Sequence, residues 1–123
     1  MTKTIASRAA TLVLVTALVL GGCGGGEQYG AAPSDRAPTP IADIVTDPAG
    51  FDGREVTVSG TIERECPTGC WFDLREGTTI IHVDLAPNGL AIPQHVGRTV
   101  TVDGMVTLRD GRAIVHGKGV TIR

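Results

Sequence analysis

The chain has 123 residues, with 11 Lys and Arg against 13 Asp and Glu, and only one Trp, one Tyr and two Phe. A surface that binds nucleic acid needs Lys and Arg to neutralise phosphates and aromatic side chains on which bases can stack. Because the sequence shows neither a basic stripe nor an evident set of stacking platforms, we expect a protein that does not bind nucleic acid.

The N-terminus has the features of an export signal. Lys3 and Arg8 precede a largely apolar run at 11–20, which is too short to span a hydrocarbon core of about 30 Å but suits a secretory signal peptide. The following LGGC sequence at 20–23 resembles a bacterial lipobox. This resemblance implies that residues 1–22 are removed and that Cys23 carries lipid, with acyl chains such as palmitate. The protein would then be anchored in the cell membrane or outer membrane, facing the extracytoplasmic side.

Residues 23–40 are rich in Gly, Pro, Ala and polar side chains. Such a segment cannot bury enough apolar surface to offset the entropy lost on ordering. We therefore predict a flexible linker between the lipidated Cys23 and a folded domain. The remaining residues, 41–123, are sufficient for one small domain with a modest core.

Alternating β-branched residues predict the strands of that domain. After a short helical turn at 41–47, two similar stretches, GREVTVSG at 53–60 and GRTVTVDG at 97–104, each begin at a turn glycine. We expect Gly60 and Gly104 to face inward at tight bends, which a small closed barrel requires at its corners. The apolar side chains expected on the inward face are Val56, Val58, Ile62, Val100, Val102, Val106 and Leu108, with the alternating residues, Thr57 and Asp103 among them, facing solvent.

Three more strands are expected, at 70–75, 79–85 and 113–122. The Asp110-Gly111 turn before the last of them is the strongest hairpin signal in the chain. A non-strand loop at 86–97 separates the third and fourth strands and holds three expected apolar anchors, Leu90, Ile92 and Val96. Five strands with this interruption predict an all-β fold, a small five-stranded OB-fold barrel.

The order of these motifs resembles that of exported bacterial OB-like domains. The motifs are GRxVxVxG, then CPxGCWFxL at 66–74, then IxVD, and then a second GRxVxVxG. Some domains of this kind are grouped by fold with the tRNA-anti-like, nucleic-acid-binding OB superfamily, and others form uncharacterised families marked by a paired-cysteine, Gly and Trp signature. The resemblance covers residues 53–122 and implies the fold, but it assigns no activity to any residue.

Cys66 and Cys70 are left as an even pair if Cys23 carries lipid, in a compartment that favours oxidation. They flank a three-residue Pro-Thr-Gly loop between two predicted strands, where facing residues have Cα atoms about 4.5–5.5 Å apart, within disulfide range. We therefore predict a Cys66–Cys70 disulfide that closes the hairpin. A disulfide that closes so short a loop can be strained and easily reduced. In that case the protein acts as a thiol–disulfide partner, which is the second of two alternative functions.

The first alternative is a Cu(I)- or Zn-binding accessory protein that uses Cys66, Cys70 and His82. Thiolate and imidazole ligands suit both ions. The cysteine spacing resembles the Cu(I) site of cytochrome oxidase assembly proteins. Trp71, His82 and Met105 share the outward parity of their strands, which is similar to the arrangement in periplasmic copper- and silver-binding OB-fold proteins of efflux systems.

Catalysis is not expected, because the sequence shows no nucleophile accompanied by a general base. Asp73 and Glu76 have the pattern of solvated charges beside a turn. The sequence therefore predicts a membrane-anchored lipoprotein of the cell envelope without a cofactor. Its OB-fold domain is expected to serve as a binding or interaction module for an unidentified protein or small ligand.

Overall fold

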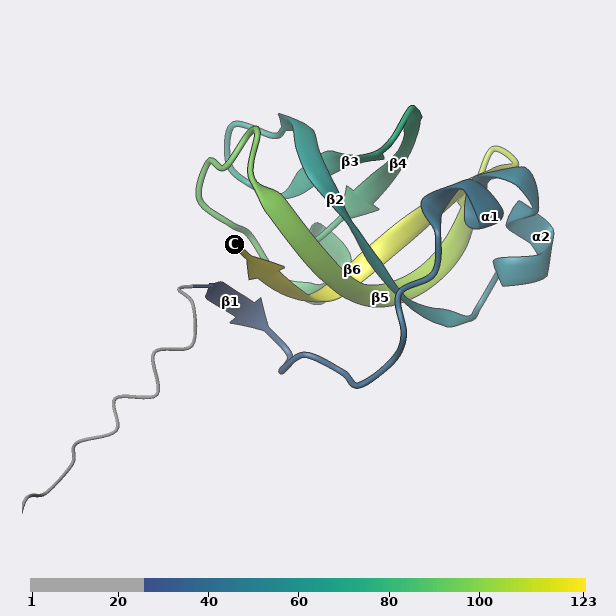
Figure 1. Ribbon diagram of the computed structural model, residues 1–123, viewed down its shortest axis with the longest axis horizontal. Helices are drawn as coiled ribbons and strands as arrows, with labels where there is room; N and C mark the ends of the chain where they lie inside the picture. Colours follow the sequence, from purple (N-terminus) through teal and green to yellow (C-terminus); the bar gives the residue numbers. More distant parts are fainter. Residues whose placement is uncertain (1–25) are drawn as a thin grey trace, which may run out of the picture.

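Five long strands close into a barrel in the computed structural model, which describes residues 26–123 (Figure 1). The strands are β2 (Glu55–Glu65), β3 (Trp71–Glu76), β4 (Thr79–Asp84), β5 (Thr99–Arg109) and β6 (Arg112–Ile122). Their order around the barrel is β2-β3-β4-β6-β5, and the β5–β2 pairing closes it. All neighbours are antiparallel except β4 and β6. This confirms the predicted OB-fold barrel, while the predicted signal peptide and Cys23 lie outside the described residues.

Side-chain alternation places the core inside the barrel. Six of the seven apolar residues predicted to face inward are at most 2% exposed: Val56, Val58, Ile62, Val100, Val102 and Val106. The prediction for Leu108 is wrong, since it is 39% exposed. Leu108 pairs with Ala113 one step from the β5–β6 turn, beyond the part of the barrel that the core fills.

The two predicted bend glycines lie where strands approach each other closely. A Cβ atom on Gly60 would come within 3.0 Å of the carbonyl group of Arg75, and one on Gly104 would come as close to that of His116. Gly104 also follows a shift in the β5–β6 register, as expected of a bulge that bends the strand. Glycine at these positions therefore permits the barrel to close.

From residue 26 onward, the N-terminal segment differs from the flexible linker predicted over 23–40, and residues 23–25 lie outside the described part of the chain. Strand β1 (Glu27–Gly30) pairs antiparallel with the second half of β6, on the edge that β4 leaves free. Farther along, the backbone N–H of Thr39 donates to the carbonyl oxygen of Thr57 over 2.7 Å. Backbone pairing and polar contacts therefore order this segment, although it buries little apolar surface.

A polar cluster fastens this segment to the barrel. Ser34 donates its hydroxyl to Asp103 over 2.7 Å and its backbone N–H over 3.1 Å, and the Thr57 hydroxyl donates to the same carboxylate. Thr57 and Asp103 are thus buried, 3% and 5% exposed, rather than facing solvent as predicted. Burial alone would raise the pKa of Asp103, but these hydrogen bonds outweigh it and hold the pKa below its usual value.

Short helices and one loop cover the two ends of the barrel. Helices α1 (Ile41–Thr46) and α2 (Pro48–Phe51) lie at the end opposite the start of β1 and the C-terminus (Figure 1). Glu76 is not a free charge, because it accepts a 2.9 Å hydrogen bond from the backbone N–H of Ile41. The loop after β4 contains a 3₁₀ turn, η1 (Ala86–Asn88), and buries Ile92 but leaves Val96 60% exposed, so Val96 is not the predicted anchor. Within residues 26–123, no helix combines the length and apolar character needed to cross a membrane.

Candidate ligand-binding groove

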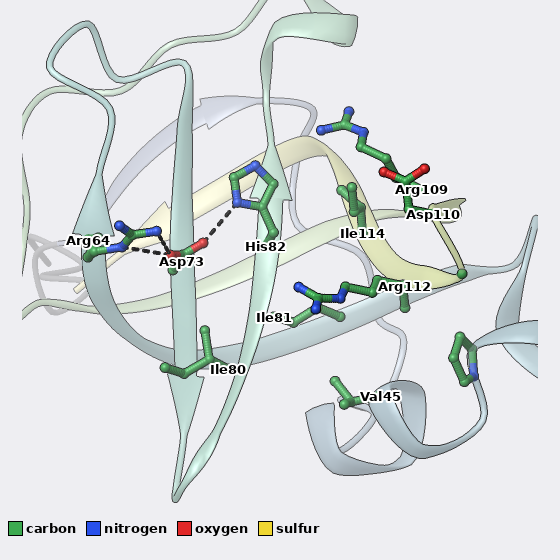
Figure 2. Close-up of a pocket in the computed structure, with 13 residues that line it drawn as sticks. Val45, Arg64, Asp73, Ile80, Ile81, His82, Arg109, Asp110, Arg112 and Ile114 are labelled. Carbon is green, nitrogen blue, oxygen red and sulfur yellow. Dashed lines mark hydrogen bonds and ion pairs between the residues drawn. The ribbon is translucent and has the colours of Figure 1, made fainter.

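An open groove of about 900 Å³ lies over the outer face of β3 and β4 (Figure 2). Asp73 of β3 and His82 of β4 lie in this groove, and Arg64 of β2 lies beside them. The other side is formed by the β5–β6 turn and by helical residues, namely Arg109, Asp110, Arg112, Val45 and Pro48. The groove therefore combines charged side chains with apolar ones.

Strand alternation explains why these polar side chains face outward. Phe72 and Leu74 enter the core, fully buried, and so Asp73 between them points to the outer face. The β3–β4 pairing sets Asp73 directly opposite His82. A register shift between Ile62 and Arg64 then brings Arg64 opposite Asp73 from the other side.

Asp73 joins its two neighbours into one cluster (Figure 2). Its Oδ1 lies 2.8 Å from Nδ1 of His82, and its Oδ2 accepts hydrogen bonds from Nε and Nη2 of Arg64 over 2.9 and 2.8 Å. Asp73 is only 9% exposed, which corrects the prediction of a solvated charge. A carboxylate at Nδ1 fixes that nitrogen as the donor, so the neutral His82 ring presents Nε2 as an acceptor.

Trp71 extends this cluster as an aromatic platform. Its ring centroid is 5.2 Å from that of His82, at an interplanar angle of 39°, and the Arg64 guanidinium carbon lies 5.6 Å from the Trp71 ring. These distances suit aromatic and cation–π contact. Across the face, Arg109 donates to Asp84 over 3.3 Å. The arrangement can stack against a flat ring and donate hydrogen bonds to anionic oxygens.

The structure brings Cys66 and Cys70 together directly before Trp71. Their sulfurs are 2.7 Å apart and both cysteines are free, so the predicted disulfide stays a prediction. Hydrogen bonds lower the pKa of Cys66 to about 6, first that from the Cys70 thiol and then that from the Thr68 hydroxyl, with backbone N–H groups adding to them. A thiol with such a pKa is largely a thiolate at neutral pH, the form that reacts in disulfide exchange.

The three ligands predicted for copper or zinc do not form a common site. Within residues 26–123, no group of three or more His, Cys, Asp or Glu side chains is placed to hold a metal ion. His82 is engaged by Asp73, apart from the cysteine pair. Met105 does not join Trp71 and His82 either, since it lies on β5 opposite His116.

The groove contains three arginines that were not predicted as site residues, Arg64, Arg109 and Arg112, and it contains Asp73, which was predicted to be a solvated charge. A signal for Asp73 was available, because a hairpin that turns between Glu76 and Thr79 places Asp73 opposite His82. No comparable signal marks the three arginines, which reach the groove from β2 and from the β5–β6 turn.

No protein-family model matches the chain, and no curated protein sequence matches it. Among solved structures it is similar to the hypothetical protein ygiW from E. coli, at 17% identity and a TM-score of 0.54, over 77% of this chain and 99% of that one. It is also similar to an asparaginyl-tRNA synthetase from Pyrococcus horikoshii, at 18% identity and a TM-score of 0.56, over 69% of this chain and 22% of that one. A third similar structure is the S. pombe Stn1–Ten1 complex, at 15% identity and a TM-score of 0.50, over 75% of this chain and 78% of that one. Similarity at this level shows the fold and agrees with an OB-fold barrel.

These structures overturn the expectation that nucleic acid is excluded as a partner. The same barrel occurs in a protein whose name states that it acts on tRNA. That expectation rested on the composition of the whole chain, which does not show how the charged side chains are distributed over the surface. The fold instead gathers Arg64, Arg109 and Arg112 around one groove, a concentration that a residue count does not reveal.

Proposed function

We propose that this protein is a non-catalytic binding module of the cell envelope, held at the membrane by lipid on Cys23. Its groove binds an oligomer that carries anionic groups and rings able to stack on an aromatic side chain. The observation that carries the proposal is a side-chain cluster on β2, β3 and β4. The buried Asp73 binds both Arg64 and His82, and the Trp71 ring lies against these two side chains. OB-folds bind oligonucleotides and oligosaccharides on this strand face and its flanking loops.

The chemistry of the groove supports an anionic, ring-bearing ligand. Arg112 and Arg109 on the β5–β6 turn face the Asp73 cluster across the groove (Figure 2), so an anionic chain laid along it meets guanidinium groups from two directions. Trp71 and His82 offer ring faces beside them, and stacking on an aromatic side chain is worth about 1–3 kcal/mol per base. The exposed side chains of Val45 and Ile80 add apolar surface.

The membrane anchor is supported by the LGGC sequence after the apolar run. Each buried CH₂ of an acyl chain contributes about 0.8 kcal/mol, so two or more chains on Cys23 hold a protein stably at a membrane. Cys23→Ser is expected to release the protein from the membrane fraction while leaving the barrel folded. Unchanged membrane association of this variant would refute the anchor.

Trp71 provides the test of the groove, because it is the only tryptophan in the chain. The purified mature protein is titrated with a single-stranded oligothymidine of about 12 nucleotides and, separately, with an oligogalacturonate, while Trp71 fluorescence is followed. We expect a saturable change with at least one probe, weaker at higher salt because ion pairs are screened. If neither probe changes the fluorescence, the proposed ligand class is wrong.

Matched arginine variants locate the site. Arg112→Gln removes a charge from the groove, whereas Arg54→Gln removes one from an exposed position outside its lining. We expect Arg112→Gln to weaken binding about 5- to 20-fold, because Arg112 is exposed and water compensates part of a lost charge-assisted contact. Arg54→Gln should leave binding unchanged. Equal effects of the two variants would show binding by overall charge rather than by the groove.

A further inference from the structure

The position of β1 limits the distance between the barrel and the lipid anchor. Glu27, the first residue of β1, pairs with Ile122 at the end of β6. Only four peptide steps separate Glu27 from Cys23, and a fully extended chain covers at most about 14 Å in that length. If the tether were flexible as far as residue 40, it would reach about 60 Å. The start of β1 must therefore stay close to the bilayer surface.

We infer that one edge of the barrel, formed by Glu27, His95, Val96, Arg98 and Arg123, rests against the lipid headgroups; this inference rests on the proposed lipidation of Cys23. We call this surface the anchor-side edge. Its occupant is the bilayer itself rather than a protein partner.

Contacts join the anchor-side edge into one unit beside the start of β1. Nε2 of His95 lies 3.1 Å from Oε2 of Glu27. Arg98 donates to the backbone oxygen of Arg123 over 2.6 Å, and the backbone N–H of Arg123 donates to Thr99 on β5 over 2.9 Å. The loop before β5 and the C-terminus are thus fixed next to the residue that leads to the anchor.

The side chains of this edge suit a headgroup layer. Val96 is 60% exposed, the most exposed of the large apolar side chains in the described part of the chain. Arg98 and Arg123, which contact each other, are also exposed, and guanidinium groups donate to phosphate oxygens while their alkyl stems lie along apolar surface. Exposed apolar side chains together with arginines are the composition that interfacial surfaces present to lipid. The Glu27 carboxylate accepts a 2.6 Å hydrogen bond from the Tyr29 hydroxyl and contacts the His95 ring.

Strong attachment of β1 to the barrel keeps this edge near the anchor. The β1–β6 pairing and the Ser34–Asp103 contacts hold the segment along its length. The helices α1 and α2 and the β5–β6 turn lie at the opposite end of the barrel (Figure 1), and these elements form one side of the groove. The groove therefore opens away from the membrane, where a ligand can reach it.

The test uses the lipidated full chain in vesicles of phosphatidylethanolamine and phosphatidylglycerol at a ratio of 3:1. The variant Val96→Trp is made in a Trp71→Phe background, so that the tryptophan at position 96 is the only one. Its fluorescence is quenched with a lipid that carries a nitroxide on the headgroup. The matched control is Ile80→Trp in the same background, because Ile80 is 47% exposed and lies in the groove.

We expect quenching at position 96 to be at least threefold stronger than at position 80. Adding Arg98→Glu should reduce quenching at position 96 while the protein still sediments with the vesicles through its lipid. Equal quenching at the two positions in protein whose intact mass includes the lipid would overturn the inference and leave the anchor standing. A wild-type mass without lipid would overturn the anchor and the inference together.

Discussion

The change Asp73→Asn tests whether one carboxylate organises the groove. An amide keeps one oxygen acceptor and turns the other oxygen into an NH₂ donor. The amide oxygen is expected to face the Arg64 cation, which leaves NH₂ facing Nδ1 of His82. His82 must then accept at Nδ1 and carry its proton on Nε2, so its tautomer is reversed.

The cost of this change follows from the exposure of the partners. The Arg64 side chain is 70% exposed, so water can replace the hydrogen bonds that Asp73 accepts from it. The ion pair therefore contributes only about 0–1 kcal/mol to the free energy of unfolding. The His82 side chain is 30% exposed, and weakening its bond to an ionised partner adds about 1 kcal/mol. Asp73→Asn should therefore destabilise the barrel by about 1–2 kcal/mol and lower Tm by roughly 5–15 °C.

Two measurements check this prediction. Thermal unfolding followed by circular dichroism gives the stability, and the ¹⁵N shifts of the His82 ring identify its tautomer. The matched control is Glu63→Gln, which makes the same chemical change in a pair with Arg75 whose two side chains are 42% and 41% exposed; it should change stability by less than about 0.5 kcal/mol. Unchanged His82 ring shifts in Asp73→Asn would refute the role given to this carboxylate.

Three further predictions address the cysteine pair, the barrel bend and the buried carboxylate. Cys66 and Cys70 should take up no alkylating label in the unreduced mature protein, as intact mass spectrometry would show. Uptake of two labels would refute the predicted disulfide. Gly104→Val should lower Tm by several degrees, because its side chain meets the backbone of β6 at a typical overpacking cost of about 1–3 kcal/mol; a neutral result would mean that the bend is not crowded. The pKa of Asp103 is lowered in the folded protein, so its contribution to stability is present above about pH 4 and is lost as pH falls through the folded pKa. Asp103→Asn should therefore flatten the acid limb of stability against pH in chemical denaturation, and an unchanged limb would contradict this assignment.

The barrel was predictable because its strands are encoded locally. Alternating β-branched residues and turn glycines give each strand its inward face without reference to its partners, and the core predicted from them is nearly the observed one. The N-terminal segment was not predictable in the same way. Its order depends on the free edge of β6 and on the carboxylate of Asp103, both of which exist only once the barrel has formed.

The candidate groove was predictable only in part, for a similar reason. The β3–β4 turn fixes the pairing of Asp73 with His82 by simple counting from Glu76 and Thr79. Arg64 reaches the same carboxylate only because the register of β2 shifts after Ile62. The local sequence contains no feature that predicts this shift. The predicted solvent exposure of Asp73 failed because a count of charges cannot show which of them share a strand face.

The negative charge of the whole chain does not oppose an anionic ligand at the groove. Removal of residues 1–22 would leave nine basic and 13 acidic side chains, but at physiological ionic strength charges are screened beyond about 8 Å. A ligand in the groove therefore responds chiefly to the groups that line it, where Arg64, Arg109 and Arg112 face Asp73 and Asp110. Arg64 is paired with Asp73 and Arg109 with Asp84, so an anionic ligand competes with carboxylates for these two guanidinium groups and meets Arg112 in addition. Because these contacts are ionic, we expect binding in the groove to weaken as the salt concentration rises.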